Sequence, residues 1–189
     1  MRTASRRVLF LVASARRSGN SETLARRAEA GLPEGTVREW IHLQDVPLPP
    51  FVDHRHASGS DGTFPQPSGN EAVLLDATLA AADLVFVAPV YWYGLPASAK
   101  LYLDYWTAWM RVPGRDFRAR MAGKTVWVIG ALSDEDPAVA EPLLQTLRLS
   151  ARYLAMRWGG ELFGYGSRPG DVLADAAALA AADDFFRGA

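Results

Sequence analysis

The sequence predicts an α/β fold: one doubly wound sheet of five parallel strands, in the order 2-1-3-4-5, with helices on both faces. Two features predict it. Apolar, β-branched runs of strand length alternate along the chain with amphipathic segments of helix length. Some of these runs contain no polar residue, which is typical of parallel strands buried on both faces. The length suits a single domain over residues 1–189.

The first strand is expected over Val8–Val12, and a helical pattern then follows with Leu24 and Ala28 on one face. The loop between them is rich in hydroxyl, amide and basic side chains. Free N–H groups and the positive dipole at the start of a helix add to these donors, so the loop can bind an anion. We expect the anion to be held by Ser14, Arg16, Ser18, Gly19, Asn20 and Ser21.

The kind of anion follows from motifs that this loop lacks. It matches neither the G-x-G-x-x-G loop of dinucleotide-binding proteins nor the G-x-x-x-x-G-K-[ST] loop of nucleoside triphosphate-binding proteins. A hydroxyl-rich loop between the first strand and helix favours a phosphate monoester, as in a flavodoxin-like sheet that holds FMN. The alternative interpretation is that Ser18 or Asn20 only caps the helix and that the arginines are solvated.

A second, more exposed strand is expected over Thr36–Leu43, at a sheet edge. The segment Gln44–Gly69 then reads as a long loop rich in Pro, Gly, Ser and Asp, and loops of this length are usually functional or mobile. Whether it forms a lid stays open. His54 and His56 lie within it, but Arg55 between them disfavours a cation, so we expect no metal site.

The central elements follow. We expect a helix over Asn70–Ala82, a buried strand over Leu84–Val90 and a helix over Ala97–Trp109, with the aromatic segment Tyr91–Tyr93 between the last two. In the predicted strand order the first and third strands are neighbours, and ligands bind beyond their carboxyl ends. The hydroxyl-rich loop should therefore lie beside the aromatic segment.

The last third of the chain repeats the alternation. An irregular connection is expected over Met110–Gly123, a buried strand over Thr125–Ala131 and a helix through Leu143–Leu154. A weaker final strand is expected over Glu161–Tyr165. Asp171 is expected to cap the last helix, which ends near Phe186.

Composition limits the function. With 20 basic and 21 acidic residues the chain lacks the charge of a nucleic-acid binder, so we expect small-molecule partners. The absence of cysteine excludes disulfides, thiolate nucleophiles and iron–sulfur clusters, so any redox chemistry must come from a bound organic cofactor. The first apolar run is shorter than a signal peptide core, and no segment is long enough to span a membrane. We therefore expect a cytoplasmic protein that does not bind membranes.

The two loops together suit FMN, which needs a phosphate cradle at one end and aromatic or backbone contacts around its ring at the other. Side chains of the aromatic segment could flank the ring, and a turn through glycine lets backbone N–H groups approach it. The residues expected around the ring are Pro89, Val90, Tyr91, Trp92, Tyr93, Gly94 and Ser133. The alternative is that the aromatic residues are only core and dimer contacts.

The two loops and their spacing resemble the flavodoxin-like NAD(P)H-dependent FMN reductase and quinone reductase family over most of the chain. Its first loop resembles G-S-P-R-x-x-G-N-[ST], and its third-strand segment resembles P-x-Y-W-x-x-P-x-x-x-K. The matching residues are Ser14, Arg16, Gly19, Asn20, Ser21, Pro89, Tyr91, Trp92, Pro96 and, slightly out of register, Lys100. Ala13 and Ala15 replace the family's Gly and Pro, and Val46–His56 lacks the cysteines of the iron–sulfur branch.

The resemblance implies an FMN enzyme that takes hydride from NADPH or NADH and reduces a small acceptor: a quinone, free flavin, azo or nitro compound. It implies no catalytic acid or base that can be named here. Family members commonly form dimers, so we expect a homodimer or homotetramer, with Trp106 and Trp109 as exposed interface candidates. Two alternatives stay open: an electron-transfer flavodoxin and, because of Ala13 and Ala15, a non-catalytic FMN-binding protein.

Overall fold

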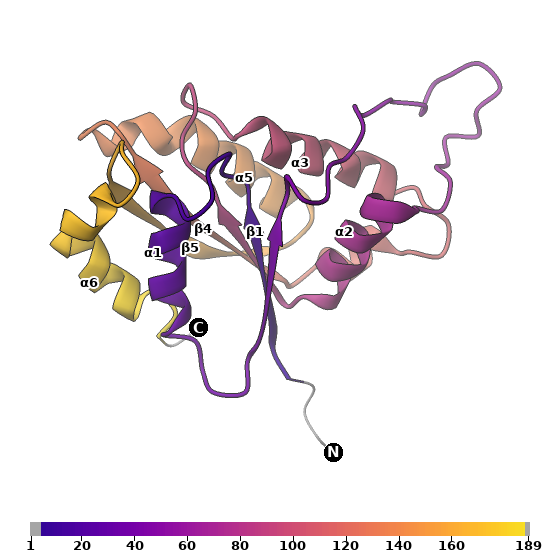
Figure 1. Ribbon diagram of the computed structural model, residues 1–189. Coiled ribbons are helices and arrows are strands. Elements are labelled where there is room, and N and C mark those ends of the chain that lie inside the picture. The colour runs from indigo at the N-terminus through magenta and orange to yellow at the C-terminus, as the bar shows by residue number, and fades with distance from the viewer. Residues whose placement is uncertain (1–4, 188–189) are drawn as a thin grey trace.

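The computed structural model describes residues 5–187 and contains one sheet of five parallel strands in the order β2-β1-β3-β4-β5 (Figure 1). The predicted fold class and strand order are confirmed. The strands are β1 (Arg7–Val12), β2 (Val37–His42), β3 (Asp83–Val87), β4 (Thr125–Leu132) and β5 (Arg157–Tyr165). The helices are α1 (Asn20–Glu29), α2 (Gly69–Ala80), α3 (Ala97–Trp109), α4 (Phe117–Met121), α5 (Glu141–Tyr153) and α6 (Ala176–Asp184), with single 3₁₀ turns at Pro137–Ala140 and Asp171–Ala174.

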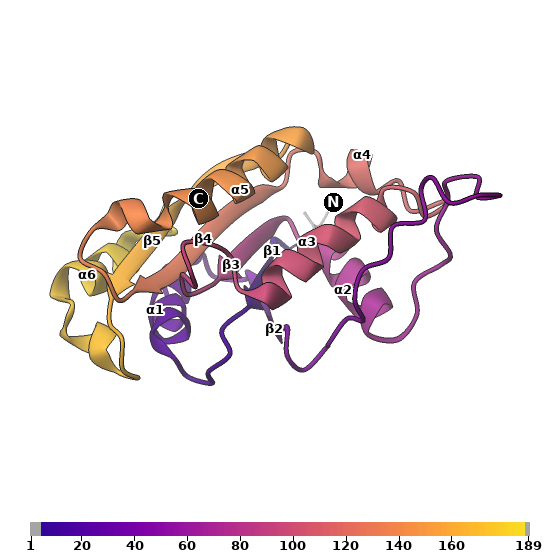
Figure 2. The ribbon, with the colours of Figure 1, turned by 90° about the horizontal axis from the view of Figure 1, so that it is seen from above.

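Helices cover both faces of the sheet. Seen from above, α1 and α6 lie on one side, and α2, α3 and α5 lie on the other (Figure 2). Alternate residues of β1 supply the two cores, because side chains along a strand point to opposite faces. Phe10 packs in the core under α1 and α6, whereas Leu9 and Leu11 pack in the larger core under α2, α3 and α5. The continuous apolar run of β1 is thus explained by burial on both faces.

The central strand β1 pairs with both β2 and β3, and β3 pairs in turn with β4. The loops that follow β1, β3, β4 and β5 therefore meet at one edge of the sheet, at the top of Figure 1. Gly130 in β4 permits this close packing. A Cβ there would lie 2.5 Å from the Ala88 carbonyl oxygen and 2.4 Å from the Phe163 ring, so only glycine fits.

Several expected boundaries were wrong. The connection Met110–Gly123 is not irregular throughout, because it contains α4, whose Phe117 and Met121 are buried. Strand β3 ends at Val87, before the expected Val90. Strand β5 begins at Arg157, earlier than expected, because a bulge allows pairing to continue through two adjacent glycines.

Two expected residue roles were also wrong. Asp175, not Asp171, caps α6, since its carboxylate accepts the Ala178 N–H at 3.0 Å. The Asp171 carboxylate instead accepts backbone N–H groups in the preceding turn. Trp106 and Trp109 are not exposed: they are 5% and 0% accessible, because α3 turns them into the core.

The residues between β2 and α2 form the expected long loop, which extends away from the body of the molecule (Figure 1). Its middle contains the histidines that sequence analysis considered as metal ligands. Asp53 there is bound to Arg55, whose guanidinium holds the pKa of that carboxyl well below its ordinary value. Within residues 5–187 no three His, Asp or Glu side chains gather as a metal site, and no helix is long and apolar enough to cross a membrane.

Candidate active site

Two adjoining cavities, of about 170 and 190 Å³, open at the edge of the sheet where β1, β3, β4 and β5 end. The first is lined by Ser14, Arg16, Gly19, Asn20, Ser21, Pro89, Val90, Tyr91, Ala131, Ser133, Gly166 and Ser167. The second is lined by Val90, Trp92, Tyr93, Leu132, Ser133, Asp134 and Val139. Val90 and Ser133 line both, so the two cavities lie side by side.

The start of α1 gives the first cavity its anion-binding character. Gly19 is the N-cap residue and has no side chain to cap the helix, and the first intrahelical bond runs from Thr23 N–H to the Gly19 carbonyl at 2.9 Å. The N–H groups of Asn20, Ser21 and Glu22 therefore have no acceptor within the helix. With the positive end of the helix dipole, these groups favour a bound anion.

Ser21 strengthens this interpretation. Its hydroxyl is buried and has no hydrogen-bond partner among residues 5–187. A buried hydroxyl without a partner costs roughly 1–3 kcal/mol, and a bound phosphate that accepts its hydrogen would remove this cost. The residues around this cavity therefore fit the phosphate group of FMN.

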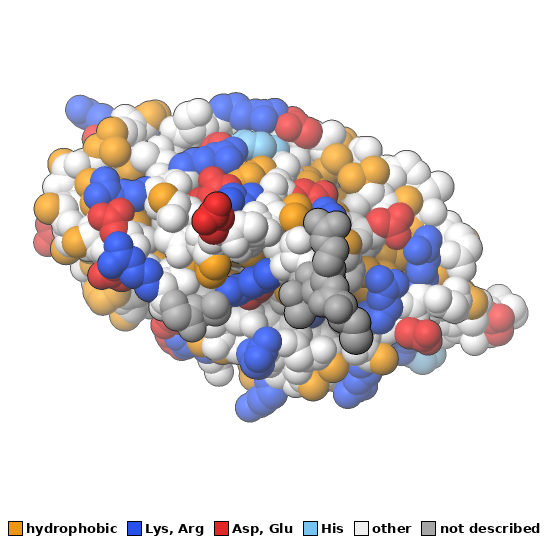
Figure 3. Space-filling view, turned by 90° about the horizontal axis from the view of Figure 1, so that it is seen from below, with side chains coloured by type: hydrophobic (Ala, Val, Ile, Leu, Met, Phe, Trp, Pro, Cys, Tyr) orange, Lys and Arg blue, Asp and Glu red, His pale blue; other side chains and the backbone are white. Residues whose placement is uncertain are grey.

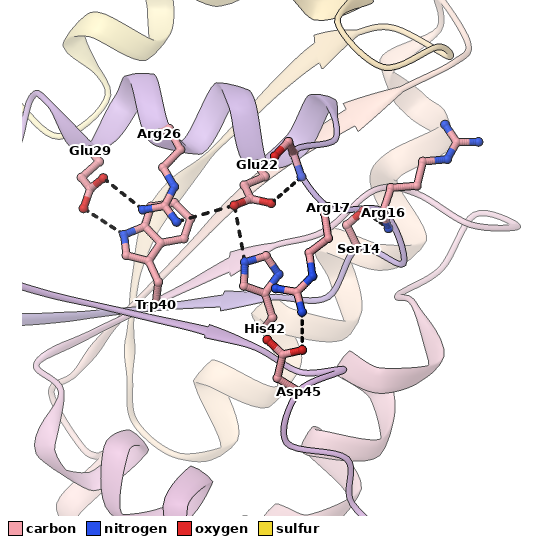
Figure 4. Close-up of polar contacts among 10 residues, drawn as sticks. Ser14, Arg16, Arg17, Glu22, Arg26, Glu29, Trp40, His42 and Asp45 are labelled. Atoms are coloured by element: carbon pink, nitrogen blue, oxygen red, sulfur yellow. Dashed lines mark hydrogen bonds and ion pairs between the residues drawn. The ribbon is translucent and has the colours of Figure 1, made fainter.

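Two further loop residues shape the cradle (Figure 4). The Ser14 hydroxyl accepts the backbone N–H of Arg16 at 3.1 Å, which folds the loop back on itself. The Arg16 guanidinium donates to the Ser167 carbonyl at 3.0 Å and so joins the loop after β1 to the loop after β5. Arg16 is the one charged side chain along the described lining of the first cavity, which leaves that lining net positive.

Asn20 lines the cavity, but its side-chain amide is already bonded. It donates to the Arg168 carbonyl at 2.9 Å and accepts the Gly170 N–H at 2.9 Å, so it ties α1 to the loop after β5. Ser18 is exposed, has a φ of 51° and lines neither cavity. Of these two expected phosphate ligands, Asn20 retains its backbone N–H for an anion, and Ser18 lies outside the cradle.

The aromatic segment after β3 forms a tight turn. Tyr91 and Gly94 exchange both backbone hydrogen bonds, at 3.2 and 3.0 Å. Between them Trp92 and Tyr93 have φ angles of 49° and 63°, in the left-handed region that side-chain-bearing residues seldom adopt. The Trp92 side chain is 94% exposed at the rim of the second cavity. Strained residues of this kind cluster at ligand sites.

Sequence analysis missed part of the lining, namely Ala131, Leu132, Asp134, Val139, Gly166 and Ser167. The sequence signal for Gly166 and Ser167 was their position just after the last strand. In a parallel sheet, residues that follow any strand lie at the same carboxyl edge as the other loops of the site. Gly166 fits only as glycine, because a Cβ would lie 2.7 Å from the Asn20 side-chain nitrogen. Gly94, which was expected at the ring, lines neither cavity and serves to close the turn.

A larger hollow, of about 670 Å³, lies elsewhere, near the amino ends of the strands. Figure 3 shows that face of the molecule, on which basic and acidic side chains are mixed. Asp83 in the hollow has protein partners: it is bound by Arg6 at 2.7 Å and by the Trp127 indole at 3.0 Å. Lys124 donates to the main-chain carbonyl groups of Leu79 and Ala81. The hydroxyl-rich loop and the aromatic turn lie at the other edge of the sheet.

A doubly wound parallel sheet, with free helix N–H groups and a buried hydroxyl after its first strand and an aromatic turn after its third, has the arrangement of a flavodoxin-like FMN-binding protein. The sequence profile of the NADPH-dependent FMN reductase family matches residues 6–157. The chain belongs to this family. It is an enzyme, an NAD(P)H-dependent oxidoreductase that uses FMN.

Known proteins similar to this chain carry related names. YwqN of Bacillus subtilis strain 168, whose name describes an NAD(P)H-dependent FMN-containing oxidoreductase, is 33% identical over 173 residues, 91% of this chain and 92% of YwqN. The structure of Trp repressor binding protein from B. subtilis superposes with a TM-score of 0.74 at 26% identity, over 96% of this chain and 99% of that one. An NAD(P)H:quinone oxidoreductase from Methanothermobacter marburgensis shares the fold, with a TM-score of 0.70 and 20% identity over 97% and 96% of the two chains.

Proposed function

We propose that this enzyme transfers hydride from NADPH or NADH, through FMN, to a small organic acceptor: a quinone, a free flavin, or an azo or nitro compound. The observation that carries the proposal is the pair of adjoining cavities. One end offers unpaired N–H and hydroxyl donors for a phosphate, and the other offers an exposed aromatic rim. A ligand with a phosphate at one end and a flat ring at the other matches both.

Different residues of the two cavities would bind the phosphate, the flavin ring and the acceptor. The phosphate would be held by the Ser21 hydroxyl, the Arg16 guanidinium and the free N–H groups of α1, with Ser14, Ser18 and Gly19 shaping the loop and Asn20 anchoring it. The ring would lie along Pro89, Val90 and Tyr91, with Ser133 opposite. Trp92 and Tyr93 would line the space for the acceptor, and Gly94 would close their turn.

The bound FMN would supply the redox chemistry, accepting hydride from NAD(P)H and passing it to the acceptor. The protein's part is to orient the reactants and to exclude water. No side chain of the described lining is placed as a catalytic acid or base in this proposal. The quinone named for the M. marburgensis structure and the flavin named for the family are the acceptor classes to test first.

Two other functions remain as alternatives to be tested. An electron-transfer flavodoxin would dock on protein partners, usually through a strongly acidic surface. The net charge of −1 does not favour it. A non-catalytic FMN-binding protein would follow if Ala13 and Ala15 weakened the cradle. Ala13 is buried, and its N–H bonds the Val87 carbonyl at 2.9 Å, so alanine fits there without disturbing the edge.

Absorption spectroscopy of the purified protein under anaerobic conditions tests the proposal. We expect bound flavin bands that bleach within seconds of adding NADPH or NADH and return when a quinone is added. Flavin that binds but stays oxidised would favour a carrier or storage protein. A protein that binds no added FMN would overturn the proposal.

We further propose that residues 1–189 form a single FMN-binding domain that works in the cytoplasm as a homodimer or homotetramer. The apolar run that resembles a leader core is β1, which is paired on both sides within the sheet. Exposed aromatic residues beside the site, Trp92 at 94% and Tyr93 at 58%, offer a surface that a second copy could cover. Analytical ultracentrifugation of the FMN-loaded protein tests the oligomeric state, and a monomer at micromolar concentration would contradict it.

A further inference from the structure

The side chain of Glu22 lies behind the phosphate cradle, on the face of α1 that is turned toward β2 (Figure 4). The residue is only 8% exposed. One carboxylate oxygen accepts the backbone N–H of Ser18 at 2.9 Å. The other lies 3.4 Å from the His42 Nε2 and 3.5 Å from an Arg26 guanidinium nitrogen. The carboxylate therefore joins the loop, the helix and β2.

The hydrogen bond to Glu22 fixes the loop at Ser18, the residue of the loop whose backbone conformation is least favourable. Ser18 has a φ of 51°, a left-handed conformation that costs roughly 1–3 kcal/mol for a residue with a side chain. The Ser18 N–H donates to Glu22 instead of to a ligand. Held in this way, the chain enters α1 with Gly19 as N-cap, and the next three N–H groups and the Ser21 hydroxyl stay free.

A carboxylate at this position also has a cost. A phosphate bound at the start of α1 would lie near the negative charge of Glu22, and like charges repel. The adjacent Arg26 offsets part of that charge, and His42 faces the same oxygen from β2. Arg26 is itself held in place, because its guanidinium stacks 3.4 Å above the Trp40 ring.

We propose that Glu22 is a positioning residue for the phosphate of FMN: it holds Ser18, and through it the loop, in the shape that leaves the donors of α1 free. This inference rests on the proposed function, and it assigns to Glu22 the preference of the flavin site for a ligand that carries a phosphate. In a capping box the glutamate at the third helical position bonds the N–H of the N-cap residue, whereas Glu22 reaches one residue further back, to the Ser18 N–H. The purely stabilising role and the positioning role differ in one measurable respect, the preference for FMN over riboflavin.

Riboflavin lacks the phosphate, so the ratio of FMN to riboflavin affinity isolates what the cradle contributes. Flavin fluorescence titrations of the flavin-free protein give both dissociation constants. In Glu22→Ala we expect FMN affinity to fall about fivefold to tenfold, the effect of one lost buried hydrogen bond. Riboflavin affinity should change less than about twofold, since the ring contacts are untouched.

Glu22→Gln separates hydrogen bonding from charge. Its amide oxygen can still accept the Ser18 N–H, while the negative charge is gone. We expect Glu22→Gln to bind FMN as tightly as the wild type or up to about fivefold more tightly, because the repulsion between the Glu22 carboxylate and the phosphate is removed. If Glu22→Gln loses FMN affinity as Glu22→Ala does, the positioning role is overturned.

Glu29 provides the matched control on the same helix. Its carboxylate accepts the Trp40 indole N–H at 2.9 Å and lies 3.7 Å from an Arg26 guanidinium nitrogen, so it shares Arg26 with Glu22 and joins α1 to β2 without touching the loop. Glu29→Ala should lower the thermal unfolding temperature and leave the FMN to riboflavin ratio unchanged. If Glu22→Ala does not fold, Glu22→Asp, whose carboxylate is too short to reach Ser18, takes its place.

The outcomes are distinguishable. A wild-type protein that binds FMN well, with an unchanged FMN to riboflavin ratio in Glu22→Ala, overturns this inference and leaves the proposed function standing. A wild-type protein that binds neither flavin overturns both. A ratio that falls in Glu22→Ala, stays high in Glu22→Gln and is unaffected in Glu29→Ala supports the positioning role.

Discussion

At the scale of single residues, the hydroxyl groups of the first loop differ in whether they already have a hydrogen-bond partner in the protein. The Ser14 hydroxyl is bonded to the Arg16 N–H, whereas the Ser21 hydroxyl is buried without a partner among the described residues. An unpaired buried group destabilises the protein that carries it. Ser21 is therefore the residue whose chemistry depends most directly on a bound phosphate.

Ser21→Ala should have opposite effects on stability and on binding. The flavin-free protein should gain about 1 kcal/mol of unfolding free energy, because a buried unsatisfied hydroxyl is removed. FMN affinity should fall about fivefold to tenfold, because the phosphate loses a hydrogen bond. Denaturant unfolding of the flavin-free protein and a fluorescence titration with FMN measure the two effects.

Ser150→Ala is the control for this pair of measurements. The Ser150 hydroxyl bonds the Thr146 carbonyl at 2.8 Å within α5 and lies outside both cavities. Its loss should leave FMN affinity unchanged. A Ser21→Ala protein that is less stable without flavin than the wild type would show that the hydroxyl has a protein partner after all.

The sequence could place Ser14, Ser21 and Ser133 near the site, because residues that follow parallel strands must lie at their carboxyl edge. It could not show that Ser18 faces away from the cradle. That depends on a left-handed φ held by Glu22, a contact between side chain and backbone that leaves no periodic pattern. It also could not show that the Asn20 amide is already bonded to the loop after β5, since that contact joins residues far apart in the sequence.

At the scale of elements, the turn after β3 departs most clearly from local preference. Turns with two successive left-handed residues favour Asn and Gly, but here Trp92 and Tyr93 occupy these positions. Neither side chain is buried enough to repay the strain by packing, since they are 94% and 58% exposed. The aromatic side chains are thus retained at a cost in stability, as expected of a ligand-binding turn.

Replacing Trp92 and Tyr93 by Asn and Gly should stabilise the flavin-free protein and impair the enzyme. We expect a gain of about 1 kcal/mol from the relieved backbone strain. The kcat/KM for an aromatic acceptor should fall about tenfold, because the rim loses its stacking surface. Thermal unfolding and steady-state kinetics with a quinone measure the change.

The matched control for the turn is Tyr153→Gly, at the end of α5. Tyr153 is 57% exposed but helical, so glycine there should cost up to about 1 kcal/mol. If the turn variant also loses stability, then the left-handed residues are not strained in the folded protein.

The misplaced boundaries have physical causes at this scale too. The start of β5 was missed because Gly159 and Gly160 interrupt the apolar pattern, yet Gly159 is needed there: a Cβ would lie 2.3 Å from the Trp127 indole. Helix α4 was missed because it is short and contains Arg118 and Arg120, so its two buried residues, Phe117 and Met121, give no helical hydrophobic pattern. Short elements fixed by distant packing give little local signal.

At the scale of the whole molecule, the strand order was predictable because it follows from long-range rules. Uninterrupted apolar runs require burial on both faces, and parallel strands require crossovers through helices. The two resulting cores are separate: one lies under α1 and α6, and the other lies under the remaining helices. The expected exposure of Trp106 and Trp109 was wrong because it rested on the dimers of the family and not on the pattern of α3. Lys100 and Asp104 pair along the exposed face of that helix, and the two tryptophans lie away from it in the core.

The larger core contains a titratable group that makes the stability of the whole fold depend on pH. Tyr102 of α3 is fully buried, and its hydroxyl shares a 2.6 Å hydrogen bond with the Thr78 hydroxyl of α2. Burial raises the pKa of Tyr102 above the ordinary value of 10.0, because the phenolate would lose its hydration. In the unfolded chain the phenol ionises at that ordinary value, so the stability it contributes is complete below it and is lost as pH rises.

We therefore expect the free energy of unfolding to fall above pH 10, by up to about 1.4 kcal/mol per pH unit. Urea unfolding of the flavin-free protein between pH 8 and pH 11, about the range over which the phenol ionises, measures this slope. Tyr102→Phe should lose about 1 kcal/mol at pH 8 with the hydrogen bond but should show a shallower alkaline slope. Part of the slope should remain, because the pKa of Tyr105 is also raised by burial.

Comparing Tyr102→Phe with the wild type isolates the buried phenol. Burial lowers the pKa of Lys124, which makes stability rise with pH, but this contribution is the same in both proteins and cancels in their difference. If Tyr102→Phe and the wild type lost stability in parallel above pH 10, then the core would admit enough water to hydrate the phenolate. Helix α3, which follows the aromatic turn directly, would in that case not be the rigid support that the acceptor site requires.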